Sequence, residues 1–495
     1  MKTKFFPHNR VKNATAYATL LKSHRVTMLE NNIKIILITS CLSSIVTVII
    51  VAFLLRNTAF VNVLEPRTAE NSIKVGTRDE SSTNRIAEGS TSNITSSVNL
   101  VRLPHAVKLG AVCLDGSQPA YYFRKGHGKG STKWLVHFFG GAWCFDEVSC
   151  VQRSKTILGS TKHLPAYPPK LQGILSGDYK VNPDFYNWNA VLLCYCDGAS
   201  FTGYLSQPIS VDGRNVYFRG KKILHVIMNE LLLGELKNAD KVLLSGTSAG
   251  ALAAMMNADY IRERLPKSAD VRVFADSGYF IDVAAVNGQD IINRHFRNMV
   301  RVHNSINYLD KDCIKALKPT LRWKCIFPQH SIKYIQTPVF VLQSAYDPWQ
   351  LINIRGINCQ TPEYSDSFNV RRSRIYRRSR ETERVSDHST WRYKHIHGIY
   401  CKPPECTRLE MSSVLQYRNV SLFALRPVLL SKKNGLIVTS CLEHSQSVYD
   451  DTWNDVYVNG FSLSQAVGNW VFGRTAEHLY LDCEYPCNPS CSNVW

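Results

Sequence analysis

The segment Val242-Leu243-Leu244-Ser245-Gly246-Thr247-Ser248-Ala249-Gly250 decides the fold, because it joins an apolar run to the helix-forming residues Ala251-Leu252-Ala253-Ala254-Met255-Met256. The apolar run predicts a buried strand. Gly-x-Ser-x-Gly between a strand and a helix is typical of a nucleophile elbow, in which small flanking residues permit a sharp turn that presents the serine hydroxyl. The segment predicts an α/β-hydrolase-like fold with a mostly parallel sheet, and Ser248 as the candidate nucleophile.

The candidate acid and base come later in the chain, each just after a predicted strand. Asp347 follows the apolar run 337–343, and His444 follows the run 435–440. Either residue alone could belong to an ordinary loop, but the order serine, acid, histidine is the one that this fold uses. Asp276, which follows a predicted strand over 271–275, is the alternative acid. We expect Asp347 to be the acid and Asp276 to shape the site.

An oxyanion hole is predicted upstream of the elbow. A strand over 134–139 leads into Gly140-Gly141-Ala142-Trp143-Cys144. A glycine-rich turn brings main-chain N–H groups close to a reacting oxygen, although such a turn often serves only to reverse the chain. We expect the N–H of Gly141 or Ala142, together with that of Ala249, to stabilise the oxyanion. Trp143, Tyr346 and Trp349 flank these loops and could stack on sugar rings, but core packing is the expected job for at least two of them.

The chain before residue 100 predicts an anchored protein. Residues 35–55 carry no charge and are long enough to cross the roughly 30 Å hydrocarbon core of a bilayer. A cleaved signal peptide is the alternative, but its apolar core normally lies nearer the N-terminus. All charged residues in the range 1–34 are Lys or Arg apart from Glu30. The positive-inside rule therefore predicts a cytosolic tail and a type II membrane protein. Residues 56–99 predict a flexible stem, rich in Ser and Thr, and residues 100–495 one large lumenal or extracellular catalytic domain.

The net charge of +20, from 59 basic and 39 acidic residues, favours acidic partners. The irregular stretch 360–397 is rich in arginine. It is expected to be a solvated basic loop, with a polyanion contact or a processing site for a basic-specific protease as alternatives. No nucleic-acid partner is expected, because no reading motif accompanies the charge.

Cysteine usage agrees with an oxidising compartment. Of the 15 cysteines, Cys41 alone lies in the predicted anchor and the others follow it, which predicts a disulfide framework. Cys144 and Cys150 are close enough for a local loop. Cys483, Cys487 and Cys491 are expected to form disulfides rather than a zinc site, since no histidine pair supports zinc there. The sequons at Asn93 and Asn419 are compatible with glycosylation.

From about Leu100 to the C-terminus the chain resembles the plant pectin acetylesterase family, which has the carboxylesterase Notum as an animal relative. The resemblance is carried by long strings of residues, which chance cannot produce together. They are Gly110-Ala111-Val112-Cys113-Leu114-Asp115-Gly116-Ser117, Trp134-Leu135-Val136-His137-Phe138, Asn182-Pro183-Asp184-Phe185-Tyr186-Asn187-Trp188-Asn189, Tyr195-Cys196-Asp197-Gly198-Ala199-Ser200-Phe201-Thr202-Gly203, Ala466-Val467-Gly468-Asn469-Trp470 and Asp482-Cys483-Glu484-Tyr485-Pro486-Cys487-Asn488-Pro489.

The resemblance implies a serine esterase that removes acetyl groups from pectin or another acidic acetylated polysaccharide, with the family's triad on Ser248, Asp347 and His444. It implies no metal and no cofactor, and it does not indicate an oligomeric state. Four positions depart from the family pattern. Phe139 replaces a glutamate, Ala142 a glycine, and Thr247 and Ser445 cysteines. Because Ala142 still offers its N–H, we expect catalysis to survive, whereas Phe139 could reshape the pocket.

Two other functions fit less well. A Notum-like deacylase with a deeper pocket would accept longer acyl chains, but the segment 197–203 is plant-like. A non-catalytic polysaccharide-binding protein could use its basic loop to grip pectin, but the intact triad residues make this improbable. The sequence therefore predicts a pectin acetylesterase in the secretory pathway, either anchored as a type II protein or secreted to the cell wall.

Overall fold

A computed structural model describes residues 97–168, 170–357 and 406–491, all within the compact unit that begins at Ser92. Within these ranges no helix has both the length and the hydropathy needed to cross a bilayer. The predicted cytosolic tail and anchor, nearly all of the stem, Asn93 and the arginine-rich stretch lie outside the described residues, so the predictions made for them stay predictions.

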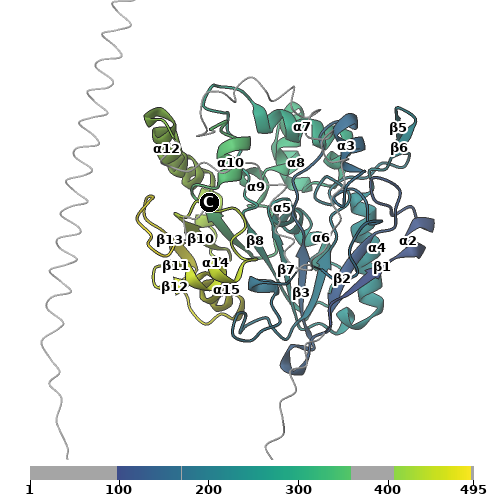
Figure 1. Ribbon diagram of the computed structural model, residues 1–495, viewed down its shortest axis with the longest axis horizontal. Coiled ribbons are helices and arrows are strands. Elements are labelled where there is room, and N and C mark those ends of the chain that lie inside the picture. Colours follow the sequence, from purple (N-terminus) through teal and green to yellow (C-terminus); the bar gives the residue numbers. More distant parts are fainter. Residues whose placement is uncertain (1–96, 169, 358–405, 492–495) are drawn as a thin grey trace, which may run out of the picture. The chain divides into compact units, whose positions relative to one another are not determined.

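One large sheet forms the centre of the compact unit that begins at Ser92 (Figure 1). Strand β2 runs antiparallel to both of its neighbours, and all other pairs in this sheet are parallel. This confirms the predicted α/β-hydrolase-like, mostly parallel sheet. Across the sheet the strands are β1 (Asn99–Arg102), β2 (Ala120–Arg124), β4 (Asn189–Leu193), β3 (Lys133–Phe138), β7 (Lys241–Thr247), β8 (Asp270–Asp276), β9 (Val339–Ser344), β10 (Gly435–Thr439) and β13 (Leu479–Leu481).

The central strands are apolar because helices cover both faces of the sheet. In β7, Val242 and Leu244 belong to one core, and Leu243 to the other. Residues of α4, α5 and α12 pack in the first core, and residues of α14 and α15 in the second. The two-residue period of the strands thus divides their side chains between two cores.

Helices follow most strands at their carboxyl ends. In Figure 1, α7, α10 and α12 lie in the upper part of the picture, beyond this edge of the sheet. The helices are α2 (Pro104–Lys108), α3 (Glu147–Arg153), α4 (Gly220–Leu233), α5 (Ala249–Met256), α6 (Ala258–Arg262), α7 (Ile291–Val302), α8 (Lys311–Ala316), α9 (Pro328–Ser331), α10 (Pro348–Asn353), α12 (Arg408–Ala424), α13 (Arg426–Leu429), α14 (Asp450–Asp455) and α15 (Leu463–Phe472). The 3₁₀ helices are Gly128–Gly130, Gly173–Leu175, Glu235–Asn238, Ser305–Tyr308 and Pro319–Ile326, and two small hairpins pair β5 (Ile209–Val211) with β6 (Arg214–Val216) and β11 (Tyr457–Val458) with β12 (Phe461–Ser462).

Disulfides join loops around the sheet, which agrees with an oxidising compartment. The local pair Cys144–Cys150 forms as predicted. In the C-terminal tail, Cys483 pairs with Cys487, and Cys491 with Cys441. Where both partners lie among the described residues, two further pairs are Cys113–Cys196 and Cys313–Cys325, and the thiol of Cys194 is free and buried.

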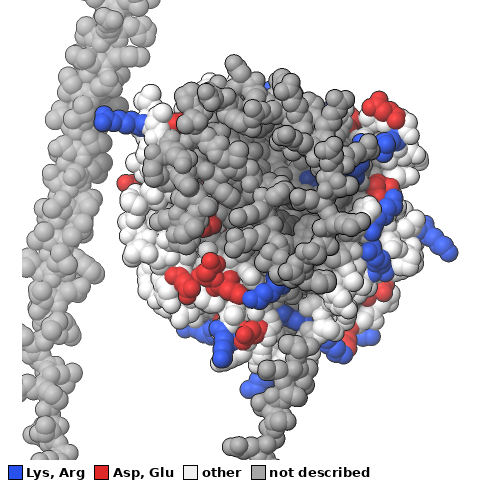
Figure 2. Space-filling model, in the orientation of Figure 1, with Lys and Arg blue, Asp and Glu red and all other residues white. Residues whose placement is uncertain are grey.

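On the face that Figure 2 shows, Lys and Arg side chains of the described residues lie beside Asp and Glu side chains. They do not form one continuous positive patch on the part of this face that is described.

Candidate active site

Ser248 occupies the turn between β7 and α5, in a backbone conformation with φ 56° and ψ −126°. This left-handed φ is strained for a serine. The flanking glycines are required by close packing: a Cβ at Gly250 would lie 2.0 Å from the carbonyl oxygen of Phe138, and a Cβ at Gly246 would lie 2.4 Å from the carbonyl carbon of Gly250. The N–H of Ser248 donates to the carbonyl of Asp276 at 2.9 Å. The predicted strand, turn and helix are therefore present.

His444 and Asp347 lie in contact, although 97 residues separate them in the sequence. Asp347 follows β9 and His444 follows β10, its parallel neighbour. The Nδ1 of His444 lies 3.0 Å from Oδ1 and 2.9 Å from Oδ2 of Asp347. With Nδ1 facing the carboxylate, Nε2 is the ring nitrogen left for proton transfer.

The carboxylate of Asp347 is held in place by three other donors. The N–H groups of Trp349 and Gln350, at the start of α10, donate to Oδ1 at 2.9 and 3.2 Å, and the side-chain amide of Gln343 donates to Oδ2 at 3.0 Å. Both Asp347 and His444 are buried. Burial opposes protonation of His444, but the charge and hydrogen bond of Asp347, with smaller contributions from Asp276 and Glu443, raise its pKa above the usual value.

Asp276, the alternative acid, binds other groups. Its carboxylate accepts hydrogen bonds from the hydroxyl of Ser277 at 2.9 Å and from the N–H and hydroxyl of Ser447, both at 2.7 Å. Ser277 in turn accepts the N–H of Ser445 at 2.9 Å. Asp276 thus supports the loop that carries His444, while its carbonyl holds the N–H of Ser248.

The loop after β3 lies against the elbow. A Cβ at Gly140 would come within 3.1 Å of the Cβ of Ser248. Gly141 and Ala142 both have positive φ, at 135° and 51°. Within the described ranges, the N–H groups of Gly141, Ala142 and Ala249 donate to no protein acceptor. All three predicted donors are therefore available, and their role in an oxyanion hole stays a prediction.

Aromatic side chains pack beside this loop. Trp143 meets Phe280 and Phe296 edge to face, with ring centroids 4.9 Å apart in both pairs, and Trp349 at 5.8 Å. The ring of Trp349 stacks at 6.1 Å from that of His444. Tyr346 is fully buried, and its hydroxyl accepts the N–H of Tyr485. All three aromatic residues thus pack against the protein, as we expected for at least two of them.

The chain is similar in sequence to known esterases over most of its length. The sequence profile described as Pectinacetylesterase matches residues 91–492. The chain belongs to the pectinacetylesterase family. It is 37% identical to Pectin acetylesterase 11 of Arabidopsis thaliana over 404 residues, which cover 80% of this chain and 93% of that protein. It is 32% identical to the palmitoleoyl-protein carboxylesterase NOTUM of Mus musculus, over 80% of this chain and 72% of that protein.

A solved structure confirms the fold. The Wnt deacylase Notum from Drosophila superposes with a TM-score of 0.63 at 24% sequence identity, covering 80% of this chain and 99% of that one. Membership of the pectinacetylesterase family makes this chain a carboxylic-ester hydrolase.

The departures from the pectinacetylesterase pattern are accommodated in the fold. The half-buried Phe139 packs edge to face on His137, with ring centroids 5.7 Å apart. Burial lowers the pKa of His137 to about 3, so this histidine is neutral, and its Nδ1 lies 2.8 Å from the hydroxyl of Ser245. Ser445 adopts φ 70° beside Ser277. Phe139, which precedes the loop 140–144, therefore packs on the neutral ring of His137.

Two clusters of the described residues have metal-ligating side chains within reach of one another. One joins Cys144 and Cys150 to His303, and the other joins Cys483 and Cys487 to Asp482. The sulfurs of each cluster are joined in a disulfide, so they offer no thiolate to a metal.

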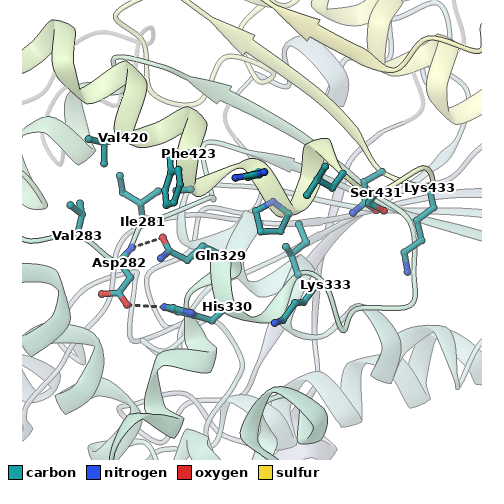
Figure 3. A pocket seen from close by; sticks show the side chains of 16 residues that line it. Ile281, Asp282, Val283, Gln329, His330, Lys333, Val420, Phe423, Ser431 and Lys433 are labelled. Atoms are coloured by element: carbon teal, nitrogen blue, oxygen red, sulfur yellow. Dashed lines mark hydrogen bonds and ion pairs between the residues drawn. The ribbon is translucent and has the colours of Figure 1, made fainter. Parts of the chain in front are cut away.

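A groove of about 850 Å³ lies between α12–α13 and the segments that contain Ile281 and His330 (Figure 3). Val420 and Phe423 form part of an apolar wall. The carboxylate of Asp282 accepts hydrogen bonds from His330 and Lys324, both at 2.7 Å. None of the triad residues lines this groove, so it is separate from the candidate active site.

The C-terminal tail supports the histidine loop in a way that sequence reasoning missed. The Oδ2 atom of Asp482 accepts the N–H and the hydroxyl of Ser440, both at 2.9 Å, and the side-chain amide of Asn488 at 2.7 Å. The disulfide Cys441–Cys491 ties the same loop to the tail. The string 482–489 is a visible signal in the sequence, because it carries the family resemblance and contains two cysteines.

Proposed function

We propose that this chain is a serine carboxylesterase that hydrolyses acetyl esters of pectin through Ser248, His444 and Asp347. The observation that carries the proposal is the doubly contacted His444–Asp347 pair at the carboxyl edge of the sheet that also presents Ser248. The similarity to Pectin acetylesterase 11 over four-fifths of the chain supports pectin as the substrate.

The proposed reaction has two halves. The Oγ of Ser248 attacks the acetyl carbon while Nε2 of His444 takes its proton, and the resulting oxyanion is stabilised by main-chain N–H groups. The bond from the carbonyl carbon to the sugar oxygen then breaks, and His444 gives the proton to that oxygen, which leaves as a free sugar hydroxyl. In the second half, His444 takes a proton from water as the water oxygen attacks the acetyl-serine, the bond from the acetyl carbon to Oγ of Ser248 breaks, and His444 returns the proton to Oγ, which releases acetate and restores the free serine. Asp347 keeps the imidazole oriented and stabilises its charged form.

We further propose that the catalytic domain acts in the secretory pathway or the cell wall, held by residues 35–55 as a type II anchor or secreted. The disulfides support an oxidising compartment. The anchor itself rests on the uncharged run in the sequence.

Acetate release tests the activity and the substrate together. The full chain is incubated with acetylated pectin, acetylated xylan and a synthetic long-chain acyl ester, with Ser248→Ala as the control. We expect acetate from pectin, and a fall of roughly 10⁴-fold or more in the variant. Cleavage of the long-chain ester alone would favour a NOTUM-like deacylase. Binding of pectin without turnover, unchanged in Ser248→Ala, would favour a polysaccharide-binding protein.

A further inference from the structure

The segment 195–203 carries much of the family resemblance, yet none of its residues belongs to the proposed triad. In the structure it forms the turn after β4. This turn contacts residues 140–144, which carry the predicted oxyanion donors and are called the oxyanion loop here. The N–H of Cys144 donates to the carbonyl of Gly198 at 3.1 Å. A Cβ at Gly198 would lie 2.8 Å from the Sγ of Cys144, so a glycine is needed for this contact.

Two side chains donate hydrogen bonds to successive carbonyl groups of the oxyanion loop. The Nη1 of Arg153, at the end of α3, donates to the carbonyl of Gly141 at 2.8 Å. The hydroxyl of Tyr195 donates to the carbonyl of Ala142, also at 2.8 Å. The guanidinium of Arg153 lies 4.9 Å from the centre of the Tyr195 ring, so the two side chains also pack together.

These two contacts determine where the N–H groups of the loop point. In a trans peptide the C=O and the N–H project in opposite directions. The carbonyl of Gly141 shares its peptide with the N–H of Ala142, and the carbonyl of Ala142 shares its peptide with the N–H of Trp143. Within the described residues neither N–H donates to a protein acceptor. Because Arg153 and Tyr195 bind the two carbonyl groups, the N–H groups of Ala142 and Trp143 point away from these two side chains.

The same network reaches the residue after the nucleophile. The hydroxyl of Tyr195 accepts the N–H of Ser200 at 3.1 Å. The hydroxyl of Ser200 accepts the indole N–H of Trp143 at 2.7 Å and donates to the carbonyl of Ala249 at 2.8 Å. The loop that offers Ala142 and Trp143 is thus connected by hydrogen bonds to the elbow that offers Ala249.

We propose that Arg153 and Tyr195 are positioning residues that hold the N–H groups of Ala142 and Trp143 toward the oxyanion formed at Ser248. This inference rests on the proposed function. It adds the main-chain N–H of Trp143 to the predicted donors, and it gives Tyr195 and Ser200 of the segment 195–203 a role beside the elbow. Because both side chains bind carbonyl groups of the loop, the role we assign to Arg153 and to Tyr195 is the alignment of the donors.

Two variants with matched controls test the proposal. Tyr195→Phe removes one hydroxyl, and Tyr122→Phe removes an equivalent one, because the buried Tyr122 donates to the carbonyl of Pro165 at 2.8 Å in a different loop. Arg153→Met is matched by Arg102→Met, since Arg102 donates to the carbonyls of Thr161 and Leu164. The probes are a soluble acetyl ester and a trifluoromethyl ketone, which forms an oxyanion adduct with a reactive serine.

We expect Tyr195→Phe and Arg153→Met to lower kcat roughly tenfold or more, with KM changed less than twofold. The inhibition constant of the ketone should rise by a similar factor, while both controls retain the kcat of the parent. Values of kcat within twofold of the parent in both test variants, or equal losses in the controls, would overturn the proposal. Failure of the proposed function is a separate result, because the parent would then release no acetate or Ser248→Ala would retain full activity.

Discussion

The carboxylate of Asp276 accepts two hydrogen bonds from Ser447, one from its N–H and one from its hydroxyl, both at 2.7 Å. Asp276 is thereby bound to the loop that carries His444, whereas the imidazole itself contacts Asp347. The buried aspartates at the end of β8 and after β9 have different partners, and this difference separates their expected roles.

Substitution of each aspartate by asparagine distinguishes these roles. Asparagine at residue 276 keeps an acceptor oxygen for Ser447, so Asp276→Asn should lower kcat/KM less than tenfold, since most hydrogen bonds persist. Asp347→Asn removes the charge beside the imidazole and should lower kcat by roughly 10³ to 10⁴-fold. Steady-state kinetics on one acetyl ester gives both values. The reverse order of the two losses would make Asp276 the catalytic acid.

The pH dependence of activity follows from the raised pKa of His444. Burial lowers this pKa, but the charge and hydrogen bond of Asp347 outweigh it. A general base works when it is neutral, so kcat/KM should rise with pH through a pKa above the ordinary histidine value. In Asp347→Asn the effect of burial dominates, and the midpoint should move to lower pH. An unchanged midpoint in the residual activity of this variant would contradict the assignment of His444 as the base.

Much of the fold could be predicted because the decisive signals are local. The run 242–250 contains its own strand, turn and helix start, and the predicted strands over 271–275 and 435–440 match β8 and β10 closely. Ser248, Asp347 and His444 could be chosen because each follows a predicted strand, and the carboxyl ends of parallel strands meet at one edge of a sheet.

The supporting contacts could not be predicted, because they join side chains to main-chain atoms distant in sequence. Tyr195 and Ala142 are 53 residues apart, and Asp276 and Ser447 are 171 apart. A lone tyrosine or aspartate has no periodic pattern that reveals such a partner. The proposed direction of the loop N–H groups rests on these contacts, so Ala142 could be proposed as a donor from the sequence, whereas the proposal of Trp143 as a second donor needs the structure.

The elbow glycines should be intolerant of a methyl group. At Gly250 a Cβ would lie 2.0 Å from a main-chain oxygen of Phe138, and main-chain atoms of a packed core cannot move far. Gly250→Ala should reduce the free energy of unfolding by about 3 kcal/mol or more. Gly234→Ala is the matched control, because its Cβ would meet nothing closer than 3.4 Å, and its change should stay within about 0.5 kcal/mol. Urea unfolding measures both, and equal values would contradict the packing argument.

The two tail disulfides should contribute unequally to stability. Cys441–Cys491 closes a separation of 50 residues and Cys483–Cys487 one of 4. Loop-closure entropy assigns them about 4 and about 2 kcal/mol respectively. Replacing both cysteines of each pair by serine should therefore lower the unfolding free energy more for Cys441 with Cys491.

Because the pair Cys441–Cys491 also anchors the loop of His444, its removal should lower kcat as well, whereas serine at residues 483 and 487 should leave kcat nearly unchanged. Denaturant unfolding and acetate release on the same samples check both effects, and equal kcat values in the two variants would show that the tail does not position His444.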